Sequence, residues 1–203
     1  MITIVDYGVG NLFSLKSSFG FLNQSVQVTG DAEIIRKADK IILPGVGAFG
    51  DAAKKLRALH LDEAVCEAAG RGAPLMGICL GMQLLFDESL EYGAHRGLGL
   101  IPGKVVPMRG VIPKDYKIPH IGWNALHFTD HKSPLFRHIN EGDCVYFVHS
   151  YYADGCAPYV TAWAEYGAPL TAAVARGNVM GCQFHPEKSG QVGLGILKAF
   201  CGL

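Results

Sequence analysis

Residues 74–86, with the sequence PLMGICLGMQLLF, restrict the fold of this chain more than any other stretch. The run begins as a short apolar segment, which is typical of a buried strand. Leu80, Leu84 and Leu85 then recur at helical spacing, so a helix should follow directly. Between the two patterns, residues 77–81 read Gly-Ile-Cys-Leu-Gly. Two glycines around one potential nucleophile predict a sharp and strained strand-to-helix elbow.

Cys79 is the potential nucleophile at the centre of this elbow. Its sulfur would lie at a helix N-terminus, where unpaired N–H groups and the positive end of the helix dipole favour a thiolate. The alternative is that Cys79 is a small buried hydrophobic residue, as most free cysteines are. The elbow alone leaves both interpretations open.

A second stretch, residues 178–188 (NVMGCQFHPEK), favours the catalytic interpretation. It reads as a short strand ending at His185, because the proline that follows cannot donate a ladder hydrogen bond. Residues two apart in an extended segment point the same way, so Glu187 should lie beside His185 and orient its ring. Cys79, His185 and Glu187 would then form a triad of nucleophile, base and orienting carboxylate. For His185 alone, a structural or surface histidine is the alternative, and Cys182 with His185 is too little for a zinc site.

Together, these two motifs resemble those of the class I glutamine amidotransferases. That family uses a cysteine on a Gly-x-Cys-x-Gly elbow together with a distal His-Pro-Glu sequence. The resemblance spans nearly the whole chain, and it implies that Cys79, His185 and Glu187 are the catalytic residues.

Strand and helix patterns alternate through the first half of the chain, which predicts a parallel sheet with helices on both faces. The expected strands are residues 2–6, 25–29, 40–43 and 74–78, and the expected helices are 12–22, 32–37 and 50–69, the last with a break near His60. Past Gly97 the expected strands are 105–106, 118–123, 145–152, 160–165, 171–176 and 179–184, followed by a helix over 190–200. We therefore expect one α/β domain over residues 1–203, with an open, mostly parallel sheet that antiparallel strands extend. The resemblance implies the same flavodoxin-like class.

Residues 44–50 (PGVGAFG) follow the third predicted strand. Sites in open α/β sheets form at the carboxyl ends of strands, and glycines allow backbone N–H groups to approach a ligand. By analogy with hydrolases, the N–H groups of Leu80 and of Val46 or Gly47 are candidates for an oxyanion hole. The alternative is an ordinary strand-to-helix turn.

Composition excludes several classes of protein. Hydrophobic residues make up 49% of the 203 residues and charged ones 18%, so the chain can bury a large core and should not be disordered. The 18 basic and 18 acidic side chains balance without a basic cluster, which argues against nucleic-acid binding. Six dispersed cysteines without a Cys-x-x-Cys pair suit reduced thiols, and neither a basic leader nor a transmembrane run is evident. We expect a cytoplasmic protein with no membrane contact.

Three further stretches resemble one branch of the amidotransferase family, the glutaminase subunits of imidazole glycerol phosphate synthase in histidine biosynthesis. They are residues 43–49 (LPGVGAF), 119–124 (PHIGWN) and 146–151 (YFVHSY). The resemblance implies that L-glutamine is contacted by Gln83, Glu91, Ser150 and Tyr151. It implies that a partner is contacted by Asn11, Trp123, Tyr146 and Lys188. The alternatives are solvent exposure for Gln83 and Glu91, and core packing for Trp123 and Tyr146.

The resemblance also implies a partner and a reaction. The partner is a (β/α)₈-barrel cyclase subunit of the HisF type, which forms a heterodimer with the glutaminase and receives its ammonia through a sheltered path. The cyclase then makes imidazole glycerol phosphate and aminoimidazole carboxamide ribotide. No cofactor or metal is expected, and glutaminase activity of the isolated subunit should be very low because the glycine-rich 44–47 loop could flip. The alternatives are the glutaminase subunit of another amidotransferase, such as pyridoxal 5′-phosphate synthase, or a non-catalytic regulatory subunit.

Overall fold

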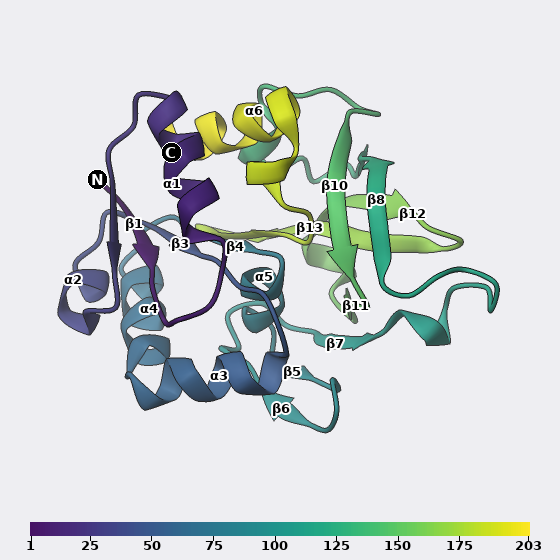
Figure 1. Cartoon of the computed structure of the whole chain (residues 1–203), viewed down its shortest axis with the longest axis horizontal. Helices are drawn as coiled ribbons and strands as arrows, with labels where there is room; N and C mark the ends of the chain where they lie inside the picture. Colours follow the sequence, from purple (N-terminus) through teal and green to yellow (C-terminus); the bar gives the residue numbers. More distant parts are fainter.

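A computed structural model describes all of residues 1–203, and its centre is an eight-stranded sheet (Figure 1). In spatial order the strands are β2 (Val26–Thr29), β1 (Ile2–Val5), β3 (Lys40–Leu43), β4 (Leu75–Ile78), β14 (Val179–Cys182), β13 (Pro169–Arg176), β12 (Val160–Glu165) and β9 (His127–Phe128). Strands β2 to β14 in this order are parallel to their neighbours, whereas β13, β12 and β9 are antiparallel. The predicted fold class is confirmed, including the antiparallel extension.

Helices cover both faces of this sheet. They are α1 (Leu12–Phe21), α2 (Ala32–Arg36), α3 (Phe49–Ala58), α4 (Leu61–Gly70), α5 (Leu80–Leu84) and α6 (Gly190–Cys201). Figure 1 shows α1 and α6 on one face and α3 and α4 on the other. Phe19 and Phe200 fill the core under the first pair, and Leu56 and Val65 fill the core under the second. Because both faces are covered, the central strands β1, β4 and β14 are buried along their whole length.

The helix boundaries follow local chemistry. The Asn11 side chain accepts a hydrogen bond from the Ser14 N–H and caps α1, and the Asp31 side chain caps α2 in the same way. His60 has a left-handed backbone with φ of 54°, which separates α3 from α4. The predicted break in the helical region 50–69 is therefore confirmed.

Two smaller sheets stand apart from the large one, whereas the sequence predicted only strands that extend the large sheet. Strands β8 (His120–Ala125) and β10 (Cys144–His149) form an antiparallel pair, and the other sheet has the order β11 (Tyr151–Asp154), β7 (Lys104–Pro107), β5 (Glu88–Ser89), β6 (His95–Arg96). Short 3₁₀ helices lie at η1 (Met108–Gly110), η2 (Pro134–Phe136), η3 (Ala157–Tyr159) and η4 (Pro186–Lys188). The prediction of one strand over 145–152 was wrong, because the chain bends at Ser150 and passes from the ladder with β8 to the ladder with β7.

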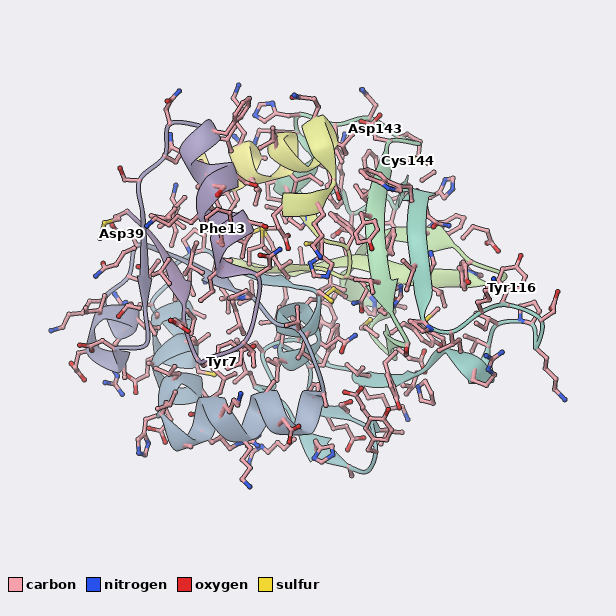
Figure 2. The ribbon with its side chains drawn as sticks, viewed as in Figure 1. Tyr7, Phe13, Asp39, Tyr116, Asp143 and Cys144 are labelled. Carbon is pink, nitrogen blue, oxygen red and sulfur yellow. The ribbon has the colours of Figure 1, made fainter.

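Strand β10 of this pair contacts α6 and the 3₁₀ helix η4, which follows β14 along the chain. Figure 1 shows β8 and β10 side by side, next to α6. Figure 2 shows Cys144 where β10 begins, and Tyr116 in the loop that enters β8 from the opposite end. None of the helices is both long and apolar enough to cross a bilayer.

Candidate active site

The elbow between β4 and α5 holds Cys79 in a strained conformation, with φ of 55° and ψ of −113°. The Cys79 N–H donates to the Cys182 carbonyl at 2.8 Å, which ties the elbow to the neighbouring strand β14. A Cβ on Gly81 would lie 1.8 Å from the Leu43 carbonyl oxygen, and one on Gly77 would lie 2.6 Å from the Gly81 carbonyl oxygen. Both flanking positions therefore require glycine.

His185 and Glu187 arrive beside Cys79 because β14 lies parallel to β4 and next to it. His185 Nδ1 donates to Glu187 Oε1 at 2.9 Å, and the two side chains are only 3% and 2% exposed. The expected extended geometry is wrong in detail, since β14 ends at Cys182 and residues 186–188 form a 3₁₀ turn. Proline at the first position of that turn pre-sets a helical φ, and the turn carries Glu187 back onto the imidazole.

The electrostatics of His185 favour its charged form. Burial lowers its pKa, but hydrogen bonds with Cys79 and Glu187, together with their negative charges, outweigh burial and raise the pKa to about 10. Glu187 occupies Nδ1, so Nε2 is the ring nitrogen left for Cys79. The arrangement can therefore hold an imidazolium against a thiolate, which is the activated state of a cysteine nucleophile.

A cavity of about 360 Å³ opens above the sulfur. Its walls include Val46, Gly47, Cys79, Leu80, Gln83, Glu91, Ser150, Tyr151, His185 and Lys188, all of them residues named from the sequence, together with Pro119, Val148 and His149. Glu187 is not among these residues and lies behind His185. Asn11, Trp123 and Tyr146 also lie outside the walls.

The loop after β3 packs directly against the elbow. A Cβ on Gly45 would lie 2.8 Å from the Gly81 nitrogen, and the Tyr7 hydroxyl donates to the Pro44 carbonyl at 2.7 Å. Gly47 has a φ of +92°, which favours glycine. No acceptor within the chain takes the N–H of Val46 or Gly47, so both donors are free beside the cavity.

Glu91 reaches the cavity wall from the turn between β5 and β6. Its Oε2 accepts a hydrogen bond from the Phe49 N–H at 2.6 Å, at the first residue of α3. A carboxylate at a helix N-terminus is favoured by the free N–H groups and the helix dipole. Burial and the Glu91 charge raise the pKa of Tyr151, which lines the same cavity.

His149, for which we predicted no catalytic role, is buried in the cavity wall. Its Nδ1 donates to the Tyr151 carbonyl at 2.8 Å, and its Nε2 lies 3.1 Å from His120 Nδ1. Burial lowers the pKa of His149 to about 3, against the opposing hydrogen bond to Tyr151. A neutral imidazole with both nitrogens engaged serves to hold Tyr151 in place.

Gln183 is a site residue that sequence reasoning missed. Its side chain is fully buried, its Nε2 donates to Cys79 Sγ at 3.7 Å, and its Oε1 accepts from Gln83 Nε2 at 2.9 Å. Its only local signal was its position two residues before His185 in a segment expected to be extended, and that pattern does not indicate the contacts with Cys79 and Gln83.

The residues assigned to a partner interface lie partly together. Trp123 is 56% exposed and packs edge-on against the half-buried Tyr146, with ring centroids 6.0 Å apart. Lys188 Nζ lies 5.8 Å from the centre of the Tyr146 ring. Core packing is therefore excluded for Trp123, whereas Asn11 serves as the cap of α1.

Comparisons with known proteins show the family to which the chain belongs. The family described as "Glutamine amidotransferase class-I" matches residues 3–201, so the chain belongs to the class I glutamine amidotransferases. Within that family its place is among the HisH subunits of imidazole glycerol phosphate synthase. The HisH of Syntrophotalea carbinolica is 48% identical over 98% of each chain, and that of Geobacillus kaustophilus is 49% identical over 100% of this chain and 97% of its own. A solved structure titled "Structure of PurLQS from Thermotoga maritima" shares the fold, with a TM-score of 0.75 and 19% identity over 99% of this chain and 97% of that one.

Proposed function

We propose that this chain hydrolyses L-glutamine to glutamate and ammonia through the triad Cys79, His185 and Glu187. The observation that carries the proposal is the buried His185–Glu187 pair beside a cysteine on a glycine-flanked elbow, with Cys79 and His185 at the cavity and Glu187 behind His185. The thiolate of Cys79 attacks the side-chain amide carbon. His185 protonates the departing ammonia and then takes a proton from the water that hydrolyses the glutamyl thioester.

The tetrahedral oxyanion would be stabilised by the N–H of Leu80 and those of Val46 and Gly47. Leu80 is the first residue of α5, where backbone N–H groups have no partner within the helix. In well-studied hydrolases one such donor contributes about 3–4 kcal/mol to the transition state. We assign the contacts with the rest of the glutamine to Gln83, Glu91, Ser150 and Tyr151, all of which face the cavity.

Residues 1–203 would act as a single glutamine amidotransferase domain in the cytoplasm and pass their ammonia to a (β/α)₈-barrel cyclase. That partner would form a heterodimer across Asn11, Trp123, Tyr146 and Lys188. It would use the ammonia to make imidazole glycerol phosphate and aminoimidazole carboxamide ribotide. The support is the family membership and the exposure of Trp123, which packs against Tyr146. Lys188 also contacts the Tyr146 ring, and it lines the cavity.

The test is Cys79→Ala in the complex with the cyclase. Glutamine hydrolysis should fall to background, whereas synthesis from added ammonium salts should continue at the wild-type rate, because the cyclase does not use the thiol. Loss of both activities in a folded complex would count against a glutaminase role. Pairing the chain with the cyclase rather than with a pyridoxal 5′-phosphate synthase subunit in a pull-down separates the two acceptors.

A further inference from the structure

We propose that Gln183 is a positioning residue for the nucleophile: its buried carboxamide donates an N–H to Cys79 Sγ and stabilises the thiolate. The inference rests on the proposed glutaminase function and extends it to a side chain outside the triad. Gln183 lies between the end of β14 and His185, and none of its surface is exposed.

The direction of the Gln183 amide is fixed by a row of three hydrogen bonds. The Tyr151 carbonyl can only accept, and Gln83 Nε2 lies 3.3 Å from it, so Gln83 must turn its NH₂ group toward that side. The same NH₂ group lies 2.9 Å from Gln183 Oε1, which therefore accepts. Gln183 Nε2 is then left to face Cys79 Sγ, at 3.7 Å.

The opposite amide orientation would disrupt this row. Turning Gln183 over would bring two NH₂ groups together at Gln83 and would aim carbonyl lone pairs at the sulfur. Turning Gln83 over as well would aim its oxygen at the Tyr151 carbonyl. His149 Nδ1 also donates to that carbonyl and helps to hold it in place. The backbone thus sets the orientation of an N–H group at the nucleophile through two side-chain amides.

The N–H of Gln183 matters because it would stabilise the negative charge of the Cys79 thiolate at a largely buried position. A hydrogen bond to the ionised form of a group favours ionisation, and bonds to charged groups are the strong ones. Gln183 needs no reorganisation when the thiolate forms, since its other end is already bonded to Gln83. His185 supplies the charge partner of the thiolate, and Gln183 supplies a neutral donor from a neighbouring position.

The test measures the alkylation of Cys79 by iodoacetamide against pH, read by mass spectrometry of the peptide that contains Cys79, in the complex with the cyclase. Gln183→Met keeps the volume and removes the donor. The midpoint of the pH profile should rise by about one to two units, the equivalent of one hydrogen bond to a charged group. The KM for glutamine should change little while kcat at neutral pH falls about 10-fold or more.

Two further variants make the result specific. Gln83→Leu leaves Gln183 in place but frees its amide, so the midpoint should also rise, by less than in Gln183→Met. Gln191→Met, at an exposed position of α6, should leave the profile unchanged. A folded Gln183→Met protein with the wild-type midpoint would overturn the proposal. If Gln183→Met does not fold, an unchanged midpoint in Gln83→Leu overturns it instead.

Failure of the proposed function gives a different pattern. If His185→Ala and Glu187→Gln both leave the alkylation profile of Cys79 unchanged, the triad is wrong. A shift in Gln183→Met would then still support the contact between Gln183 and the sulfur.

Discussion

The side chain of Glu187 is almost completely buried, and together with Cys79 it favours the charged form of His185. One oxygen accepts from His185 Nδ1, and the other, Oε2, has no hydrogen-bond partner in the chain. A buried carboxylate is costly unless a cation lies beside it. The His185 imidazolium and the Glu187 carboxylate therefore stabilise each other, which agrees with the raised pKa of His185.

Replacing Glu187 with glutamine removes this charge and should lower glutaminase kcat in the complex by on the order of 10²–10⁴-fold. The upper figure is the loss in a serine protease when the corresponding aspartate becomes asparagine. The measurement is steady-state glutamine hydrolysis. Glu63→Gln, at an exposed position of α4, is the control and should keep wild-type activity. A loss below fivefold in Glu187→Gln would show that the carboxylate is not needed.

His149 should make the protein less stable in acid. Its pKa is about 3 in the folded state and 6.5 as an ordinary histidine, so the unfolded state binds the proton more readily. The stabilising contribution is therefore complete above pH 6.5 and is lost as the pH falls toward 3. Between pH 7 and pH 5 the free energy of unfolding of His149→Gln should fall by about 2 kcal/mol less than that of the wild type.

Urea unfolding at each pH measures this difference. His131→Asn, at an exposed position, should follow the wild-type pH dependence. Equal slopes for His149→Gln and the wild type would mean that His149 is not buried in its neutral form.

The sequence motifs were sufficient to predict the positions of Cys79, His185 and Glu187, because two short motifs carry them. Gln183 and His149 could not be assigned in this way. The partners of Gln183 lie about a hundred positions earlier in the chain, and the burial of His149 depends on a ladder between β8 and β10. Hydrogen bonds of this kind depend on tertiary structure, and no local pattern encodes them.

Among the elements, the elbow formed by β4, Cys79 and α5 leaves no room for a side chain at Gly77 or Gly81. Its glycines allow α5 to begin directly against the end of β3. Local patterns predicted this element and the six α-helices, but not the short 3₁₀ helices, because buried strands and longer helices have distinct hydrophobic periods. They did not predict the bend at Ser150, where both flanking segments are equally strand-like and only their ladder partners differ.

Gly81→Ala should destabilise the elbow. The added methyl would overlap the Leu43 carbonyl, and a backbone shift to relieve this overlap costs typically 1–3 kcal/mol or more in a well-packed core. The measurement is the free energy of unfolding in urea. Gly70→Ala in α4 is the matched control, because its methyl meets nothing within 4 Å, and it should be neutral or stabilising by up to about 1 kcal/mol. Equal effects of the two substitutions would contradict the packing argument.

For the whole molecule, the exposed Trp123 packs against Tyr146, and Lys188, which also contacts the Tyr146 ring, lines the cavity. A partner that covered Trp123 would therefore also reach the mouth of the cavity. Family resemblance predicted these residues as an interface, but exposure could be read only from the folded structure.

Trp123→Ala should weaken the complex with the cyclase at least 10-fold, because large aromatic side chains at the centre of interfaces contribute about 2 kcal/mol or more. Titration calorimetry measures the dissociation constant. Phe21→Ala removes a similarly exposed aromatic ring from the far end of α1 and should change it less than twofold. Similar affinities for the two variants would place the interface elsewhere.

The isolated subunit should turn over glutamine far more slowly than the complex. The N–H groups of Val46 and Gly47 have no acceptor in the chain, and Gly47 has a φ of +92°, so this part of the loop can change its backbone conformation. Glutamine turnover with and without the cyclase and its ligand measures the difference. Full activity of the subunit alone would contradict a partner-dependent loop.

Strand β14 is the last strand along the chain, yet it lies in the middle of the large sheet between β4 and β13. During synthesis, the elbow with Cys79 therefore leaves the ribosome about a hundred residues before His185 does. The sheet cannot close until that final strand inserts, so folding must wait for contacts between distant parts of the chain, which slows it. If Cys79 and His185 act together as proposed, an unfinished chain cannot hydrolyse glutamine.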